Sequence, residues 1–355
     1  MPRKKIAAPT VDPLMDLIVG DIQNKFGTAS AGVLSAETIL CKVDTWASTG
    51  SFLIDSLIRA GNDSTRPVIP FGRLTEIAGL EASGKTTLCA QIMADVQAQG
   101  GICCLADTEE ALDLKYVASL GVDLEKVIWV RPDHMEDLFD KFEHLIQVIR
   151  KHAPDKMIAV LWDSVGATST QAEVEGSAGD AHMMLAPRVI SKNLKRLVAP
   201  IARTKTALIV TNHLYTKPNV KFGDKWETYG GQKMKYLATL RLRLTKVGQI
   251  SMTVNGIKRV IGQDIRIKTV KNKMAAGLQT TDAHLLHGAG FANDYSIFHH
   301  MAALDAVKKS GRSQVWTTPK GEEVKYMGWR GFQSHVKSHS EYGSLQDAII
   351  QILWE

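Results

Sequence analysis

A glycine-rich segment over residues 79–86 constrains the fold more than any other part of the sequence. It reads Gly-Leu-Glu-Ala-Ser-Gly-Lys-Thr and fits the pattern GxxxxGK[ST]. An apolar run over 74–78 precedes it and predicts a buried strand, and a helical stretch over 86–99 follows. A glycine-rich turn before a helix lets backbone N–H groups surround phosphate oxygens. The sequence therefore predicts a P-loop in which Lys85 reaches the β- and γ-phosphates of a nucleotide and the Thr86 hydroxyl binds Mg²⁺.

Short apolar runs alternate with helical stretches downstream of this loop. Strands are expected over 102–106, 127–130, 158–162 and 207–210, and helices over 135–152 and 185–203. This alternation is typical of a parallel sheet with helices on both faces. After about residue 236 the apolar positions alternate, which predicts antiparallel strands. We therefore predict an α/β fold whose mostly parallel sheet has an antiparallel extension.

Two further regions flank this core. Apolar residues recur at helical spacing from Leu14 to Phe26, and Gly27 follows as a stop signal. The apolar face of this helix is expected to pack on the chain's own core or on a neighbouring subunit. From about Leu285 the sequence is helical and turn-rich. We predict an N-terminal segment over 1–35, an ATPase-type core over 36–285 and a small C-terminal domain over 286–355.

The composition is that of an ordinary globular protein, with 45% hydrophobic and 23% charged residues. No stretch approaches the roughly 18 to 20 uncharged apolar residues that a membrane span needs. The basic start is followed by Asp12 and Asp16 and not by an apolar run. We expect a cytoplasmic protein without a membrane partner. The 4 cysteines include no CxxC pair, which favours buried thiols over disulfides or zinc.

Basic charge is concentrated between Asn212 and Thr280. This segment holds 14 Lys or Arg residues against Asp224, Glu227 and Asp264, whereas the whole chain has a formal net charge of +6. Such a concentration indicates a polyanion partner, most often nucleic acid. Solvated strand faces are the alternative interpretation.

Acidic residues follow two of the predicted strands. Asp163 ends an apolar run over 157–162 and is placed to bind Mg²⁺ beside a P-loop. The run Asp107-Thr108-Glu109-Glu110 follows the strand over 102–106, at the sheet edge where ligands of such folds bind. Glu109 or Glu110 is then a candidate for orienting the water that attacks the γ-phosphate. Spacing alone does not decide between them.

Five runs of residues resemble the RecA recombinases in order and spacing. They are Leu-Glu-Ala-Ser-Gly-Lys-Thr-Thr-Leu at 80–88, Asp-Thr-Glu-Glu-Ala-Leu-Asp at 107–113, Asp-Ser-Val at 163–165, Ala-Glu-Val-Glu-Gly-Ser-Ala-Gly-Asp-Ala-His-Met at 172–183 and Val-Lys-Asn-Lys-Met-Ala-Ala at 270–276. The likeness extends from about Ile22 to Phe291. It implies a RecA-like core, an N-terminal polymerisation helix and an ATP-dependent recombinase. Such a protein forms helical filaments on single-stranded DNA and exchanges strands with double-stranded DNA in recombination and repair.

The resemblance also implies roles in the nucleotide site. Glu109, and not Glu110, matches the catalytic glutamate. Lys271 and Lys273 match lysines that reach the γ-phosphate of ATP on the neighbouring protomer, although exposed strand lysines are the alternative. Asp113 and Tyr116 match residues that contact adenine. The expected ATP site comprises Gly79, Glu81, Ala82, Ser83, Gly84, Lys85, Thr86, Thr87, Asp113 and Tyr116, with Mg²⁺ at Thr86 and Asp163.

Two DNA-binding loops are implied in the same way. The first spans about 175–184. The second spans about 214–232 and is expected to lack regular secondary structure. The expected DNA contacts are Gly176, Met183, Arg188, Lys195, Arg196, Lys217, Lys221, Gly230, Gly231 and Gln232. Some of the basic residues have the alternative interpretation of solvated helix charges.

The sequence departs from the family pattern at His213, where the family usually has Gln. That residue is thought to sense the γ-phosphate, and a histidine changes its charge near neutral pH. We therefore expect the coupling of ATP to DNA to depend on pH. The chain also ends without an acidic tail, which suggests a divergent member such as one encoded by a phage.

Two other functions share the core fold. One is a ring-forming helicase or clock-type ATPase, and the other is a non-catalytic filament module. The run over 175–183 argues against the first of these. The intact residues Lys85, Thr86, Glu109 and Asp163 argue against the second.

Overall fold

The computed structural model describes residues 12–28, 30–33, 43–59, 68–176, 185–217, 223–275, 278–301, 304, 307–339 and 341–354. The chain divides into two units, Met1–Lys42 and Val43–Glu355. The first unit contains α1 (Pro13–Phe26), which Asp12 caps by accepting a hydrogen bond from Leu14 N and which ends at Gly27 with φ 99°. The predicted N-terminal helix is thereby confirmed. None of its residues is buried, and Leu17 and Phe26 are 66% and 68% exposed.

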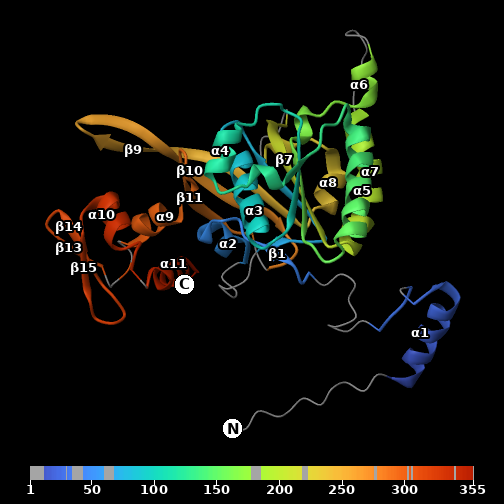
Figure 1. Ribbon diagram of the computed structural model, residues 1–355, viewed down its shortest axis with the longest axis horizontal. Helices are drawn as coiled ribbons and strands as arrows, with labels where there is room; N and C mark the ends of the chain where they lie inside the picture. The colour runs from blue at the N-terminus through green and yellow to red at the C-terminus, as the bar shows by residue number, and fades with distance from the viewer. Residues whose placement is uncertain are drawn as a thin grey trace. The chain divides into compact units, whose positions relative to one another are not determined.

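Ten strands of the described chain form one central sheet (Figure 1). Its order is β12-β11-β10-β9-β3-β7-β6-β4-β5, and β8 pairs with β7. The bounds are β3 (Leu74–Gly79), β4 (Ile102–Asp107), β5 (Val127–Trp129), β6 (Ile158–Asp163), β7 (Thr206–Thr216), β8 (Trp226–Thr228), β9 (Leu240–Val254), β10 (Ile257–Asn272), β11 (Thr280–Leu286) and β12 (Gly290–Phe291). From β5 to β9 neighbouring strands of this order are parallel, and from β9 to β12 they are antiparallel. The predicted fold class and its antiparallel extension are confirmed.

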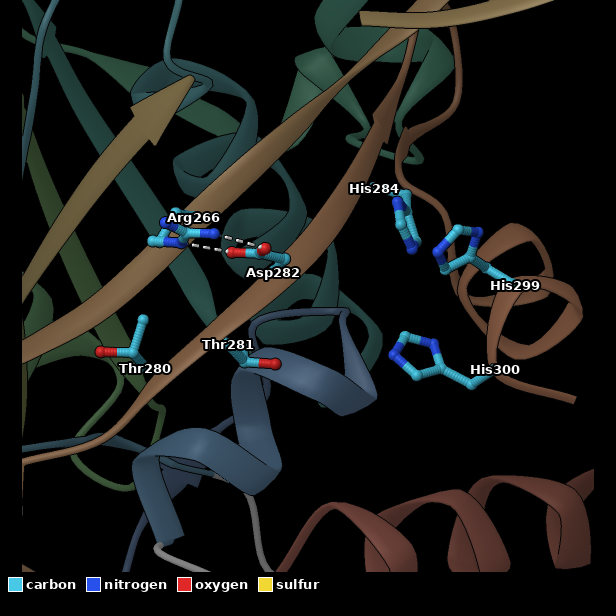
Figure 2. Close-up of a pocket in the computed structure, with 7 residues that line it drawn as sticks. All are labelled: Arg266, Thr280, Thr281, Asp282, His284, His299 and His300. Atoms are coloured by element: carbon cyan, nitrogen blue, oxygen red, sulfur yellow. Dashed lines mark hydrogen bonds and ion pairs between the residues drawn. The ribbon is translucent and has the colours of Figure 1, made fainter. Parts of the chain in front are cut away.

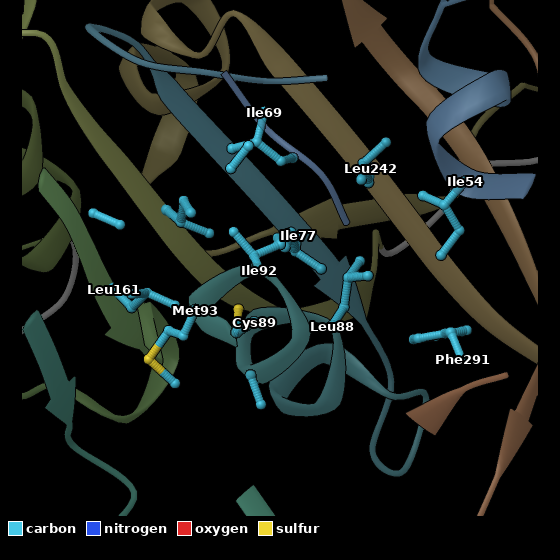
Figure 3. Packing of buried hydrophobic residues seen from close by; sticks show 14 of the residues in the cluster. Ile54, Ile69, Ile77, Leu88, Cys89, Ile92, Met93, Leu161, Leu242 and Phe291 are labelled. Atoms are coloured by element: carbon cyan, nitrogen blue, oxygen red, sulfur yellow. The ribbon is translucent and has the colours of Figure 1, made fainter. Parts of the chain in front are cut away.

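One face of this sheet is covered by the helix that follows the glycine-rich turn. The side chains of α3 (Lys85–Ala98) pack with those of α2 (Phe52–Arg59) and α4 (Leu114–Ser119). Figure 3 shows Leu88 and Ile92 of α3 facing Ile77, Leu161 and Leu242 of the strands. Every second strand residue points to this face, as the pleat of a strand requires.

The opposite face is covered by α5 (Met135–His152), α7 (Leu185–Arg203) and α8 (Gly231–Leu237). Their side chains pack against the intervening strand residues, such as Val160, Leu208 and Val210. Both long helices match their predicted bounds. The shorter elements are β1 (Trp46–Ala47), which pairs with β2 (Ile69–Pro70), the 3₁₀ turns η1 (Leu124–Lys126) and η2 (Val165–Ala167), and α6 (Gln171–Glu175).

The C-terminal part forms a second, smaller sheet with its own apolar cluster. This part of the chain contains α9 (Asn293–His300), the antiparallel strands β13 (Val307–Ser310), β14 (Ser313–Thr317) and β15 (Glu323–Tyr326), and the helices α10 (Gly328–His335) and α11 (Tyr342–Trp354). Trp316 and Phe332 are buried in this cluster, and Leu53 of α2 packs into it. The boundaries proposed for the three regions stay a prediction.

Two expectations from composition can be compared with the described residues. Among them, no helix is both long and apolar enough to span a membrane. Cys89, Cys103 and Cys104 are free and buried, as predicted, whereas Cys41 lies outside the described residues. Burial raises the pKa of Cys103 and of Cys104 to about 12, so both are neutral thiols.

Candidate nucleotide site and nucleic-acid interface

The glycine-rich turn joins β3 to α3 at the carboxyl edge of the parallel strands. Ala82 and Gly84 have left-handed backbones, with φ 54° and 87°. A Cβ on Gly79 would lie 2.9 Å from the carbonyl oxygen of Leu244 on the neighbouring strand, so only glycine fits there. The turn brings together the predicted loop residues Gly79, Glu81, Ala82, Ser83 and Gly84 at the start of a helix, where N–H groups are free to bind an anion.

The first residues of α3 face an aspartate from β6. Thr86 Oγ1 donates a hydrogen bond of 2.7 Å to Asp163 Oδ2, and Thr211 on β7 donates to Asp163 Oδ1. Burial raises the pKa of Asp163, although both hydroxyl bonds oppose the shift. Lys85 is nearby, with Nζ donating to the carbonyl oxygen of Leu80 at 3.1 Å. Burial lowers the pKa of Lys85, while the charges of Asp163 and Glu109 act in the opposite direction.

These two oxygen donors fit a magnesium ion. Mg²⁺ is held by one or two protein oxygens and takes its other ligands from water and phosphate. Thr86 and Asp163 supply such a pair. In the described part of the chain, no three His, Cys, Asp or Glu residues are grouped to hold a metal. The pair formed by Thr86 and Asp163 leaves further ligand positions for water and phosphate.

Glu109 follows β4 and faces the same site. Its Oε1 accepts a 2.5 Å hydrogen bond from Ser164 Oγ and lies 2.8 Å from His213 Nε2. Burial by itself raises the pKa of Glu109, but the bonds from Ser164 and His213 outweigh it and the net shift is downward. Glu110 is exposed and pairs with Arg131 at 3.3 Å. Of the two acids that spacing left open, Glu109 is the one whose charge acts on both Asp163 and Lys85.

The two residues expected at the adenine lie at the start of α4. Tyr116 Oη is 3.0 Å from Thr87 Oγ1, so its ring stands beside the first turn of α3. Asp113 caps α4 and accepts hydrogen bonds from the backbone of Lys115 and Tyr116. The aspartate thus has a structural role whether or not it contacts a base.

Lys271 and Lys273 lie near the end of β10, on the α8 side of the sheet. Lys271 Nζ donates to the carbonyl oxygens of Lys235 and Tyr236 at 2.6 and 2.9 Å, and Lys273 Nζ is 3.5 Å from the second of these. Burial, together with the cations of Lys273 and Arg241, lowers the pKa of Lys271 to about 8. Because α8 covers the face opposite α3, the two lysines are not part of the P-loop site of their own chain.

The described part of the second expected DNA loop contains regular secondary structure, contrary to the prediction. β7 continues to Thr216, β8 pairs with it in antiparallel register, and α8 begins at Gly231. The residues that pair are aromatic, β-branched or long, and they fit a pleated strand pair. The sequence did not reveal this strand pattern, because lysines and glycines lie close to the pairing residues. Residues 218–222, with Lys221, and 177–184, with Met183, lie outside the described residues.

The remaining predicted DNA contacts are spread over several elements. Gly176 follows α6, and Arg188 and Lys195 are exposed on α7. Arg196 is paired with Asp140 and Glu143, which supports the alternative interpretation of a helix charge. Lys217 Nζ lies 3.4 Å from Glu227 Oε2. Of the predicted contacts, the consecutive residues Gly230, Gly231 and Gln232 line a groove of about 590 Å³, together with residues that were not predicted, among them Pro187, Tyr215 and Tyr229.

Sequence reasoning missed the aromatic pair in this groove. The rings of Tyr215 and Tyr229 are 5.1 Å apart, and both side chains are exposed. Aromatic residues interleaved with lysines are a signal for binding unpaired bases, and this signal was present in the segment. Ser164 and Thr211 were also missed, because their contacts join strands that are distant in the sequence.

Comparison with known proteins gives the family. The model of the RecA N-terminal domain matches residues 14–292. Protein RecA of Bdellovibrio bacteriovorus is 34% identical over 328 residues, which cover 92% of this chain and 82% of that protein. Protein RecA of Deinococcus radiodurans is 35% identical over 313 residues, which cover 87% and 81%. The resemblance seen in the motifs is confirmed, and the chain belongs to the RecA family, as a recombinase of DNA recombination and repair with DNA-dependent ATPase and strand-exchange activity.

Proposed function

We propose that this recombinase binds ATP with Mg²⁺ at the turn between β3 and α3. The proposal is supported by the convergence of Lys85, Thr86 and Asp163 at the carboxyl edge of the sheet. Thr86 and Asp163 would hold the ion, which neutralises phosphate charge when bound. Lys85 would neutralise the β- and γ-phosphates, and the ring of Tyr116 would lie against adenine.

Glu109 is the residue that would orient the attacking water. A water-orienting carboxylate must be ionised, and the hydrogen bonds from Ser164 and His213 keep its pKa low. Lys85 is close enough to influence that charge. The contact with His213 connects the same carboxylate to β7, the strand that continues into the hairpin with β8. This contact is the single observation on which the proposed coupling of hydrolysis to DNA depends.

The assembled form would be a helical filament on single-stranded DNA. Lys271 and Lys273 lie on the face opposite the P-loop helix of their own chain. In the filament they would instead reach the nucleotide of the next protomer. The exposed apolar residues of α1 would be covered by a neighbouring subunit. ATP bound between protomers would then set filament geometry, and loss of its γ-phosphate would weaken both the interface and the hold on DNA.

DNA would lie along the groove formed by the hairpin and the start of α8. Gly230 and Gly231 have φ 94° and 71°, and their backbone can approach phosphates closely because they lack side chains. Lys217, Arg188 and Lys195 would add positive charge. Double-stranded DNA would enter as the second substrate, and base pairing between strands would supply the sequence specificity.

Phosphate release with and without single-stranded DNA tests this function. We expect stimulation by DNA, and we expect Glu109→Gln to lower the turnover by about 10²-fold or more while ATP still binds. Glu110→Gln is the matched control, because that side chain is exposed and paired with Arg131. Electron microscopy with single-stranded DNA and a slowly hydrolysed ATP analogue, beside a D-loop assay, tests the filament and pairing. A monomer under those conditions, or equal loss in both variants, would refute the proposal.

A further inference from the structure

A buried carboxylate lies between the nucleotide-binding strand and the hairpin. Glu76 is on β3, three positions before Gly79, and its side chain is 0% exposed. Its Oε1 accepts a 2.9 Å hydrogen bond from Asn212 Nδ2 on β7, and its Oε2 is paired with Arg241 Nε on β9. A buried carboxylate destabilises the fold unless its oxygens have such partners. Glu76 therefore fixes side chains from the strands on either side of it.

Asn212 connects Glu76 to the pair formed by β7 and β8. Its Nδ2 also donates to the carbonyl oxygen of Tyr229 at 2.8 Å, and its Oδ1 accepts from the backbone N of Tyr229 at 3.2 Å. The amide thus makes the two hydrogen bonds that a neighbouring strand would make. Arg241 makes a third hydrogen bond to this region, from its Nη2 to Thr228 Oγ1 of β8 at 3.2 Å. The backbone just before Gly230 and Gly231 is held against the core by these contacts.

The neighbours of Asn212 along β7 belong to the other face of the sheet. Thr211 donates to Asp163, and His213 contacts Glu109. Successive side chains of a strand point to opposite faces, so one short stretch contacts the nucleotide site on one side and the hairpin on the other. The nucleotide site and the hairpin are therefore linked through this stretch of β7.

We propose that Asn212 is a positioning residue that aligns the Gly230–Gly231 turn with the end of β7 carrying His213. This inference rests on the proposed function, in which that turn contacts DNA and Glu109 acts in hydrolysis. An asparagine is required because the position needs donors toward Glu76 and Tyr229 and an acceptor for the Tyr229 N–H. An aspartate of the same shape would have no donor and would face the carboxylate of Glu76.

The test compares Asn212→Ala and Asn212→Asp with Asp224→Asn. Asp224 pairs with Arg243 on the exposed side of the same hairpin and has no contact with Glu76 or Tyr229 in the described structure. ATP hydrolysis is measured without DNA and with single-stranded DNA, and nucleotide affinity is measured in parallel. We expect both Asn212 variants to keep basal hydrolysis and ATP affinity within about twofold and to lose about tenfold or more of the DNA stimulation. Asp224→Asn should keep the stimulation.

A paired substitution separates positioning from a general loss of structure. Glu76→Gln together with Asn212→Asp exchanges the amide and the carboxylate, so a hydrogen bond between the two positions can form again. We expect this pair to recover part of the stimulation that Asn212→Asp loses. Full DNA stimulation in Asn212→Ala would overturn the inference, as would a parallel loss of basal hydrolysis and ATP affinity without recovery in the pair. If single-stranded DNA does not stimulate ATP hydrolysis by the wild-type protein, the proposed function itself is refuted.

Discussion

His213 and Glu109 face each other across the carboxyl edge of the sheet, with Nε2 2.8 Å from Oε1. His213 pairs in register with Gly79, the first residue of the P-loop, so the contact forms beside the nucleotide site. The family usually has glutamine at this position, and both side chains can donate a hydrogen bond to the carboxylate. Only histidine can also bring a positive charge to Glu109.

Removing this contact should shift the pH dependence of hydrolysis. The bond from His213 is one of the causes that lower the pKa of Glu109, so His213→Ala should raise that pKa. Glu109 must be ionised to orient water, and the rate falls as pH drops through its pKa. The acidic limb of the pH–rate profile should therefore lie at higher pH in His213→Ala. His213→Gln keeps the donor and should retain the DNA stimulation, but with a pH dependence unlike that of the wild type. Coincident wild-type and His213→Gln profiles between about pH 6 and 8 would remove any role for the histidine charge.

Mixing two inactive variants should restore activity if Lys271 serves the neighbouring site. Lys271→Ala retains Glu109, and Glu109→Gln retains Lys271. In a head-to-tail filament assembled from equal amounts, about a quarter of the interfaces combine the intact residue of each variant. We expect DNA-stimulated hydrolysis to recover to about that fraction of the wild-type rate. The control is Lys85→Ala mixed with Glu109→Gln, since both substitutions affect the nucleotide site of one chain. If the two mixtures behave alike, Lys271 does not act in trans.

Local pattern predicted the P-loop, the parallel strands and the helices over 135–152 and 185–203, because each is encoded by residues close together in the sequence. Local pattern did not decide which of Glu109 and Glu110 faces the nucleotide site. The backbone turns at Glu110, where φ is 53°, and sends adjacent acids to different surroundings. No periodicity reveals such a turn.

Contacts between distant strands were also beyond the sequence. Strand alternation can place Lys271 on one face of β10, but it does not tell which helix covers that face. Thr211 on β7 donates to Asp163, and Ser164 after β6 donates to Glu109; only sheet order makes these residues neighbours. The pairing of β8 with the end of β7 was missed because composition suggested a loop, whereas this pairing stabilises a strand.

The apolar face of α1 should be needed for assembly. Leu17 and Phe26 are exposed, and burying such a side chain stabilises an interface by about 1.5–3 kcal/mol. Phe26→Ser should therefore raise the protein concentration needed for filaments by about tenfold or more, with ATP affinity unchanged. Asn24→Ala, which alters a polar residue of the same helix, is the control. Deleting residues 1–35 should abolish filaments in electron micrographs. Normal filaments from the truncated protein would contradict an assembly role.

Acidification should destabilise the C-terminal part of the chain through His284 and His300. Figure 2 shows His284 of β11 facing His299 and His300 of α9, beside the pair formed by Arg266 and Asp282. Ring centres of His284 and His299 are 4.6 Å apart. His284 is buried; its Nδ1 lies 2.8 Å from Asp264 Oδ1, and its Nε2 has no hydrogen-bond partner in the described structure.

The direction of the effect follows from the pKa shifts. Burial, aided by the other two rings and opposed by Asp264, lowers the pKa of His284, and burial also lowers that of His300. A histidine with a lowered pKa in the folded state favours the neutral form, so its contribution is fully present above the unfolded value of about 6.5. It is lost as pH falls from there toward the folded pKa, because the unfolded chain takes up the proton first. We expect the wild-type melting temperature to fall by roughly a few degrees more between about pH 7 and 5 than that of His284→Gln/His300→Gln, in which neither of these two rings can be protonated. Amide hydrogen exchange in α9 should accelerate over the same range, and equal pH dependence in both proteins would show that the cluster does not sense protons.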